Sequence, residues 1–259
     1  AENLENRKNN FIKYCLDYED KIPNILPIIK QGKKLEAVLI EFRMIIHLGF
    51  IIKNAILKLG EDWSFTIVCG IDNYLFIQNI KNNLNRNIKI IKLQVNNLTR
   101  EQYSVMLMKS SFYQRFSGEK LLFMQEDSLI FKKLPRHFLE YDYIGAPFAN
   151  QDVGNGGLSL RDRKCMTKLC LTYFDKHNNK RDKYANILKE LKPKIENKYG
   201  KKYFNNSNLF YVYQLELELI EDLNICKIIR EKQIGKLPDW KLATQFSIEK
   251  YYYADSFGC

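Results

Sequence analysis

The fold is decided by residues 37–70, which read AVLIEFRMIIHLGFIIKNAILKLGEDWSFTIVCG. The stretch opens with Ala37-Val38-Leu39-Ile40, a continuous apolar run typical of a strand that is buried on both faces. An apolar helix is predicted over 44–59, and Gly60 is a plausible C-cap for it. A second buried strand is predicted over 64–69. This strand–helix–strand order predicts a parallel sheet that is covered by helices.

The same alternation continues along the chain. The next expected elements are a helix at 72–84, a strand at 88–93, a helix at 98–116 and a strand at 121–124. Thr99 is a candidate N-cap, because Gln102 stands three residues later and can complete a capping box. We therefore expect an α/β fold in which helices flank a mixed, mostly parallel sheet.

The second half of the chain alternates less regularly. We expect short strands at 141–146 and 158–160, a strongly basic helix at 175–202, an amphipathic helix at 209–223 and a strand at 244–248. Residues 1–34, which precede the sheet, are predicted to form a helical extension that Pro23 and Pro27 break. The pattern gives no clear linker, so we expect one continuous domain after this extension.

Composition excludes several classes of protein. Of the 259 residues, 46% are apolar and 13% are aromatic, so the chain has ample material for a core and is not disordered. The apolar stretch 44–59 is shorter than the ~20 residues that span a bilayer, and it carries His47, Lys53 and Asn54. The N-terminus has no apolar signal-peptide region. We expect a cytoplasmic protein without a transmembrane helix.

Cysteines and histidines are scattered along the chain. None of the six cysteines form a C-x-x-C pair, which argues against a zinc ribbon. Most of them stand in apolar stretches, as Cys69 does, so we expect buried free thiols in a reducing compartment. His47, His137 and His177 are far apart in sequence, and they predict neither a Cys/His metal site nor a Ser/His/Asp arrangement.

Polar residues follow the ends of three predicted strands. These residues are Glu41 and Arg43, Gly70 and Asp72, and Gln125-Glu126-Asp127-Ser128. Ligands of open α/β sheets bind beyond the carboxyl ends of the strands. A carboxylate at that edge suits a hard divalent cation that bridges diphosphate oxygens. A turn or helix cap after the strand explains Glu126 and Asp127 equally well.

Two later segments are also candidates. Residues 153–160 read VGNGGLSL, and their glycines permit positive φ and close backbone approach to a sugar or phosphate. An ordinary tight turn is the alternative, since neither G-x-x-x-x-G-K-[ST] nor G-x-G-x-x-G is present. Glu221 and Asp222 follow a helix that carries Glu216 and Glu218, so the residues alone favour a solvated acidic face.

Several motifs occur together in a specific order. They are AVLIEFR at 37–43, Trp63, FMQEDS at 123–128, YDYIGAP at 141–147, GNGGLSLR at 154–161, Glu221-Asp222 and ATQFSIE at 243–249. The set resembles a glycosyltransferase-like family that occurs in bacteria, algae and giant viruses. It is more distantly similar to fringe-like and other galactosyltransferase-type enzymes of the GT-A fold. The resemblance covers about residues 35–259 and implies a single GT-A-like domain there, with a nucleotide-binding half at about 35–128 and an acceptor half at about 129–259.

The resemblance also implies a role for each matching residue. The expected nucleotide-sugar-binding residues are Glu41, Arg43, Gly70, Asn73, Gln125, Glu126, Asn155, Gly156 and Gly157. Asp127 matches the final Asp of the Asp-x-Asp motif of GT-A enzymes, which is the usual metal ligand, whereas Gln125 stands where the first Asp would be. Asp222 is the expected catalytic base of an inverting transfer, and Glu221 is its fallback.

The implied activity is therefore a metal-dependent glycosyl transfer. The donor would be a nucleotide-diphosphate sugar, most simply UDP-linked, the cation Mn²⁺ or Mg²⁺, and the acceptor a glycan or glycoprotein. A viral source would place the protein in the host cytoplasm or the virion.

Two alternatives differ in class. Gln125 favours a GT-A-like protein that binds glycan without turnover. The formal net charge of +11 allows a nucleic-acid-binding module. The basic segment 175–202 lacks interleaved aromatics and a base-reading motif, so we expect no nucleic-acid partner. That segment is predicted instead to border the acceptor side or to attract an anionic nucleotide sugar.

Overall fold

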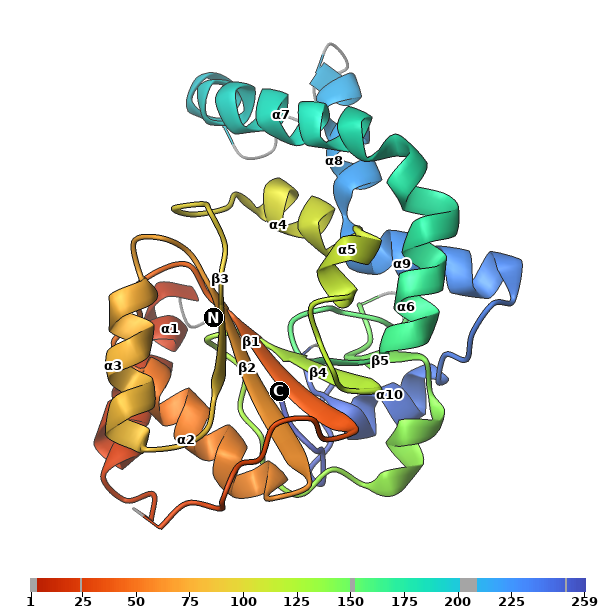
Figure 1. Ribbon diagram of the computed structural model, residues 1–259. Helices are drawn as coiled ribbons and strands as arrows, with labels where there is room; N and C mark the ends of the chain where they lie inside the picture. Colours follow the sequence, from red (N-terminus) through yellow and green to blue (C-terminus); the bar gives the residue numbers. More distant parts are fainter. Residues whose placement is uncertain (1–3, 24, 150–151, 201–208, 250) are drawn as a thin grey trace. The chain divides into compact units, whose positions relative to one another are not determined.

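The computed structural model describes residues 4–23, 25–149, 152–200, 209–249 and 251–259 (Figure 1). The chain divides into two compact units. The first comprises Ala1–Asn97, Ser117–Asp162 and Pro238–Cys259, and the second comprises Leu98–Phe116 and Arg163–Leu237. The units thus interleave along the chain, whereas the halves expected from sequence are consecutive. The boundary expected near residue 128 stays a prediction.

The first unit contains a six-stranded sheet in the order β3-β2-β1-β4-β6-β5. Its strands are β1 (Leu35–Ile40), β2 (Trp63–Cys69), β3 (Lys89–Lys92), β4 (Lys120–Met124), β5 (Tyr143–Gly145) and β6 (Ser159–Asp162). The first four run parallel, and β6 is antiparallel to both β4 and β5. The predicted mixed, mostly parallel sheet is confirmed. The strand order reverses between β1 and β4, and such a switch point is where open α/β sheets bind ligands.

Helices pack on this sheet through apolar faces. They are α1 (Leu4–Glu19), α2 (Leu48–Leu59), α3 (Tyr74–Leu84) and α10 (Trp240–Phe246), with a 3-10 turn at Arg136–Glu140. Figure 1 shows α1, α2 and α3 gathered on one side of the sheet, and Leu48 and Ile56 of α2 are fully buried in the core. The predicted C-cap is confirmed, since Gly60 has φ +76° and donates to the Ile56 carbonyl at 3.0 Å. No helix of the described ranges is both long and apolar enough to cross a bilayer.

The second unit is helical. It consists of α4 (Arg100–Leu107), α5 (Ser110–Tyr113), α6 (Arg163–Leu169), a π turn (Cys170–Phe174), a 3-10 turn (Asp175–His177), α7 (Asn178–Tyr199), α8 (Phe210–Leu219) and α9 (Glu221–Lys232). The predicted capping box is present, because the Thr99 hydroxyl accepts from the Gln102 amide and the Gln102 side chain accepts from the Thr99 amide. The basic helix expected over 175–202 is confirmed over Asn178–Tyr199, as α7, while residues 201–202 lie outside the described ranges. The single helix expected over 98–116 is wrong, since α4 ends at Leu107 and α5 starts anew at Ser110.

Two predictions for the C-terminal part are corrected. The helix expected over 209–223 breaks at Ile220, whose backbone is extended (φ −73°, ψ 104°). The strand expected over 244–248 is largely helix α10, which the Asp239 side chain caps by accepting from the Leu242 amide at 2.8 Å. The alternating residues of this segment imitate a strand. The Thr244 hydroxyl, however, donates to the carbonyl one turn earlier, which suits a helix.

The cysteines match the prediction of free thiols. All six are unbonded to one another, and four of them (Cys15, Cys69, Cys170 and Cys226) are buried. Burial raises the pKa of Cys15 to about 11, so this thiol stays protonated at neutral pH. Buried, protonated thiols behave as small apolar side chains.

Candidate functional site at the strand ends

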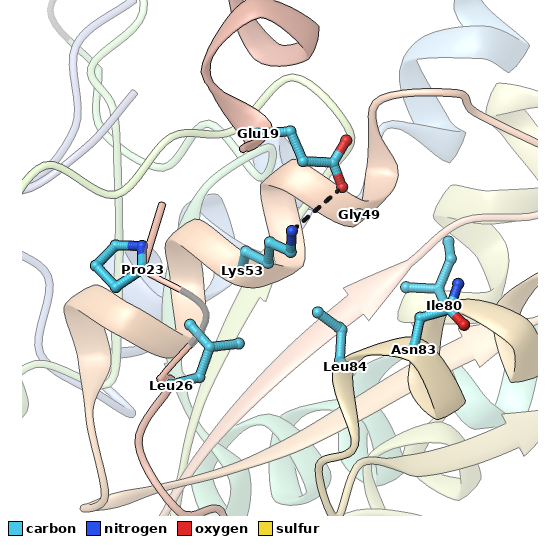
Figure 2. Close-up of a pocket in the computed structure, with 8 residues that line it drawn as sticks. All are labelled: Glu19, Pro23, Leu26, Gly49, Lys53, Ile80, Asn83 and Leu84. Atoms are coloured by element: carbon cyan, nitrogen blue, oxygen red, sulfur yellow. Dashed lines mark ion pairs between the residues drawn. The ribbon is translucent and has the colours of Figure 1, made fainter. Parts of the chain in front are cut away.

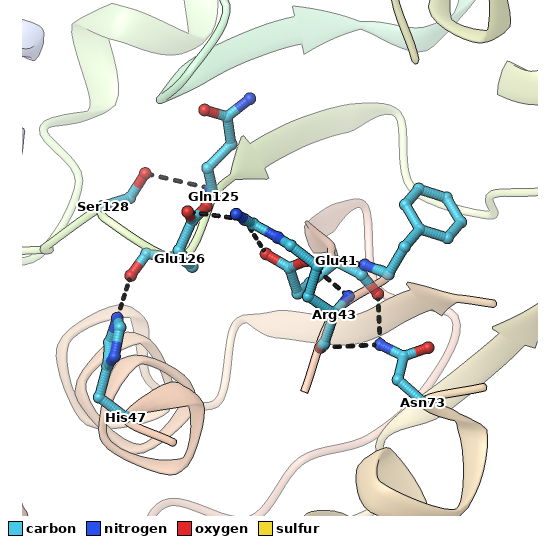
Figure 3. A network of polar contacts seen from close by, with 8 residues as sticks. Glu41, Arg43, His47, Asn73, Gln125, Glu126 and Ser128 are labelled. Carbon is cyan, nitrogen blue, oxygen red and sulfur yellow. Dashed lines mark hydrogen bonds and ion pairs between the residues drawn. The ribbon is translucent and has the colours of Figure 1, made fainter. Parts of the chain in front are cut away.

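Side chains that follow β1 and β4 meet at the switch point of the sheet (Figure 3). The Arg43 guanidinium donates to both carboxylate oxygens of Glu41, at 2.8 and 2.7 Å. Its Nη2 also lies 2.6 Å from Oε1 of Glu126. The Glu41 side chain is only 4% exposed, whereas that of Arg43 is 46% exposed. The hydrogen bond to Glu41, reinforced by Glu126, raises the pKa of Arg43, so one permanent cation joins two carboxylates.

Asn73 connects this cluster to the end of β2. Its side-chain amide donates to the carbonyls of Glu41 and Arg43, at 2.8 and 3.2 Å, and its Oδ1 accepts from the Gly70 amide at 2.9 Å. Asn73 is fully buried. A Cβ at Gly70 would lie 2.6 Å from the Val95 carbonyl oxygen, so the close approach needs glycine. The structure thus brings together the four residues predicted near the nucleotide, Glu41, Arg43, Gly70 and Asn73.

The residues after β4 form a tight turn, as one of the two sequence interpretations held. The Ser128 backbone amide donates to the Gln125 backbone carbonyl, and the Ser128 hydroxyl accepts from the Gln125 backbone amide, each at 3.1 Å. Asp127 lies in this turn and solvent reaches its side chain. Surrounding protein raises the pKa of Asp127, and the charge of Glu126 adds to that rise. The solvent access and the raised pKa are both explained by the position of Asp127 on a concave wall that is open to water.

Asp127 faces a pocket of about 370 Å³ that lies within the first unit. The lining residues are Gln125, Asp127, Ser128, Ala146, Asn155, Gly157, Leu158, Ser247, Ile248, Glu249 and Cys259. The structure brings four of the residues predicted from sequence into this one cavity: Gln125, Asp127, Asn155 and Gly157. Glu249 and Cys259 were missed, although the ATQFSIE motif already marked the segment that ends at Glu249.

Close backbone packing shapes one wall of this pocket. A Cβ at Gly145 would lie 2.0 Å from the Asn155 carbonyl oxygen, so no side chain fits there. The buried Tyr143 hydroxyl donates to the Gly154 carbonyl at 2.9 Å, and Gly154 has φ +122°, a conformation that favours glycine. Of the glycines singled out at 154–157, Gly154 supplies the positive φ, whereas the close backbone approach is at Gly145, which was not singled out from sequence.

The Asn155 side chain is fixed in orientation. Its Oδ1 accepts from the Gly157 amide at 2.9 Å, and its amide nitrogen donates to the Glu249 carboxylate. Gly156 lies between Asn155 and Gly157 in the chain, and its carbonyl accepts from the Ser159 hydroxyl at 3.2 Å. The pocket therefore presents a braced amide beside two carboxylates, those of Asp127 and Glu249. Such groups suit hydrogen bonding to sugar hydroxyls.

The donor set decides which cation this pocket suits. The part of the chain that the structure describes contains no group of three or more His, Cys, Asp or Glu side chains that could hold a metal ion. Of the two carboxylates in the pocket, Glu249 is engaged by Asn155, and a site built on Asp127 fits Mg²⁺ or Mn²⁺. Hard cations of this kind take one or two carboxylates together with substrate phosphates and water. Burial and, to a smaller extent, Asp127 raise the pKa of Cys259, so its thiol stays protonated and is a poor metal ligand.

Glu221 and Asp222, the predicted catalytic acids, lie in the second unit. They occupy the first turn of α9, where the helix dipole stabilises negatively charged side chains. Glu221 is buried, and the Asp222 carboxylate accepts from the Leu223 amide at 2.8 Å. The helix-start role is thus visible in the structure, and the catalytic role stays a prediction.

A second pocket of about 340 Å³ lies on the helix layer of the first unit (Figure 2). An ion pair crosses it, with Lys53 Nζ 3.8 Å from a carboxylate oxygen of Glu19. Pro23, Leu26 and Leu84 add apolar walls. Its lining comes from α1, α2, α3 and the segment after α1, and it includes none of the predicted site residues. The pocket beside Asp127 is therefore the better candidate site.

The chain belongs to the family described as Protein of unknown function (DUF5672), which matches residues 87–259. No curated protein matches the chain. Similar solved structures include S. aureus TarS 1-349, at 16% identity and a TM-score of 0.32, over 44% of this chain and 35% of that one. Another is the 4-diphosphocytidyl-2C-methyl-D-erythritolsynthase from Anaerococcus prevotii DSM 20548, at 14% identity and a TM-score of 0.36, over 55% of this chain and 75% of that one. Similarity at this level carries no argument about activity.

Proposed function

We propose that the protein is a glycosyltransferase that moves a sugar from a nucleotide-diphosphate donor, most simply UDP-linked, to a glycan or protein-linked acceptor. The observation that carries the proposal is the position of Asp127. Its carboxylate faces a pocket with amide and carboxylate neighbours, directly after β4 at the switch point of the sheet. Switch points of open α/β sheets bind nucleotides beyond the strand ends.

The chain's own residues would divide the binding of the donor. Asp127 would hold Mn²⁺ or Mg²⁺, and the cation would offset the charge that gathers on the departing diphosphate. Asn155, held by Gly157 and Glu249, would present its amide to sugar hydroxyls. Arg43, the half-exposed cation of the strand-end cluster, would meet the nucleotide end of the donor together with Glu41 and Asn73.

We propose Asp222 as the general base, with Glu221 as the fallback. The acceptor hydroxyl would lose its proton to this carboxylate as its oxygen bonds to the anomeric carbon. The bond from that carbon to the donor phosphate oxygen breaks on the opposite face, so the configuration inverts. Support for this role comes from the resemblance of the Glu221-Asp222 pair to the acidic pair of inverting enzymes.

One observation favours a second candidate function, glycan binding without turnover. Gln125 lines the pocket where the resemblance expects an Asp, and its side chain adds no charge to the wall that carries Asp127. A single carboxylate binds a cation more weakly than a pair does, because each anionic oxygen ligand adds attraction.

Calorimetric titration with UDP, with and without Mn²⁺, tests the proposed function. We expect UDP to bind more tightly with Mn²⁺, and Asp127→Asn to remove the Mn²⁺-dependent part while Asp62→Asn, at an exposed position, leaves it intact. Hydrolysis of UDP-sugars then separates transfer from glycan binding. Absence of UDP binding with either cation would reject the proposed UDP-dependent transferase and leave glycan binding as the remaining candidate.

A further inference from the structure

His47 is a buried histidine outside the predicted site. It directly precedes α2 and is 3% exposed. Its Nε2 lies 3.1 Å from the Glu126 carbonyl oxygen, so Nε2 must carry the proton (Figure 3). The other ring nitrogen, Nδ1, is buried and has no hydrogen-bond partner among the described residues. The Phe11 ring packs against the imidazole edge-to-face, with centroids 5.7 Å apart.

This arrangement is costly as packing alone. A buried nitrogen without a partner loses its hydration, which destabilises the folded state. An apolar side chain would fill the same space against Phe11 without that loss. The feature that only the histidine supplies is the hydrogen bond from Nε2 to the backbone of the turn that carries Asp127.

The turn's own hydrogen bonds, between Gln125 and Ser128, set its shape, and contacts from outside set its location. Arg43 holds the Glu126 side chain, and the Leu129 backbone pairs with that of Cys259. His47 adds a contact to the Glu126–Asp127 peptide itself. A few residues on, Asn54 of α2 clamps Ile130 twice, donating to its carbonyl at 3.1 Å and accepting from its amide at 2.9 Å. His47, which directly precedes α2, and Asn54, in the middle of α2, thus contact the segment on both sides of Asp127, at Glu126 and at Ile130.

We propose that His47 is a positioning residue for Asp127. By fixing the carbonyl of the Glu126–Asp127 peptide, it fixes the direction in which the Asp127 side chain leaves the turn and enters the pocket. The consequence for cation binding rests on the proposed function, whereas the anchoring of the turn does not. Outer-shell hydrogen bonds of this kind typically change metal affinity about 10–100-fold when they are lost.

A matched pair of substitutions isolates the Nε2–H group. His47→Gln and His47→Met have side chains of similar length, and only Gln keeps a donor. Asn54→Ala is the control, because it loosens the same segment at Ile130. The first readout is Mn²⁺ affinity in the presence of UDP, from the paramagnetic resonance signal of free Mn²⁺. The second is amide hydrogen exchange of residues 125–130 without any ligand.

We expect His47→Met to weaken Mn²⁺ binding about 10–100-fold and to speed exchange at 126–128, and His47→Gln to restore both largely. Asn54→Ala should speed exchange near Ile130 and lower Mn²⁺ affinity by less than the about 10-fold that marks loss of an outer-shell contact, because it leaves the bond to the Glu126 carbonyl intact. Equal exchange at 126–128 in His47→Met and His47→Gln would overturn the positioning role, even if the wild-type protein binds no UDP. Absence of wild-type binding together with the expected exchange pattern would instead reject the proposed function alone.

Discussion

Arg43 and Glu126 join the ends of neighbouring strands across the switch point, with Nη2 of the arginine 2.6 Å from Oε1 of the glutamate. Arg43 follows β1 and Glu126 follows β4, so they are far apart in sequence. The same guanidinium neutralises the buried carboxylate of Glu41. The edge of the sheet that we propose as a nucleotide site is therefore held together by one shared cation.

Loss of that cation should destabilise the fold. We expect Arg43→Met to lower the free energy of unfolding by about 1–3 kcal/mol, because it leaves Glu41 buried without its charged partner. Arg43→Lys should recover only part of the loss. Lysine keeps the positive charge but lacks the guanidinium fork that contacts both carboxylates. Lys34→Met, at the exposed pair with Glu119, should change stability by under about 1 kcal/mol. Urea unfolding measures all three, and equal losses at positions 43 and 34 would contradict the shared-cation interpretation.

Asp127 should lower stability at neutral pH. A carboxyl whose folded pKa lies above its unfolded value binds protons more tightly in the folded state, so its ionisation disfavours folding. We expect Asp127→Asn to raise the melting temperature at pH 7. The gain should shrink as pH falls through the folded pKa and vanish below about pH 4, near the ordinary pKa of aspartate, where both side chains are neutral. An Asp127→Asn melting temperature at pH 7 that is unchanged or lower would show that the folded state does not raise the pKa of Asp127.

Two glycines of the pocket should respond differently to the same substitution. Gly145→Ala places a methyl group 2.0 Å from the Asn155 carbonyl oxygen, and backbone must shift to admit it. We expect a loss of about 1–3 kcal/mol, as is typical of overpacking. Gly157→Ala meets only side-chain oxygens, of Asn155 at 3.3 Å and of Gln125 at 3.5 Å, and should cost less while weakening UDP-sugar binding. Thermal melts and calorimetric titration separate the two effects. The reverse order of stability losses would contradict the wall geometry.

Two lysines of α7 should also differ. Lys192 lies 2.9 Å from a carboxylate oxygen of Glu101 and 3.4 Å from one of Glu216, whereas Lys194 is exposed. We expect Lys192→Met to lower the free energy of unfolding by about 1–3 kcal/mol, because the buried Glu101 carboxylate loses its charged partner. Lys194→Met should lower it by under about 0.5 kcal/mol. Unfolding at several pH values measures both.

The pH dependence should identify the pair. Burial opposes ionisation of Glu101, but the hydrogen bond from Lys192 lowers its pKa below the ordinary value. Stability from a carboxylate of this kind is present above its unfolded pKa and is lost as pH falls through the folded pKa. The deficit of Lys192→Met should therefore shrink in acid. A deficit independent of pH would point to lost packing of the lysine stem.

Local sequence patterns predicted most of the first unit and the start of α4 in the second. The apolar runs became β1 and β2, Gly60 ended α2, and Thr99 with Gln102 formed a capping box, because each of these depends on neighbours a few residues away. The strand expected at 244–248 was wrong because two local patterns compete there. Its alternation of polar and apolar residues is typical of a strand, whereas the Asp239 cap three residues before Leu242 starts a helix.

Sequence by itself determined the class of the fold and the residues that follow the strand ends. It also pointed to Asp127, Asn155 and Gly157 through the resemblance. Only the tertiary structure decided that Glu249 shares their pocket and that His47 anchors the turn of Asp127. These relationships join segments that are distant along the chain, so they arise from the packing of the sheet and helices rather than from the periodicity of any single segment.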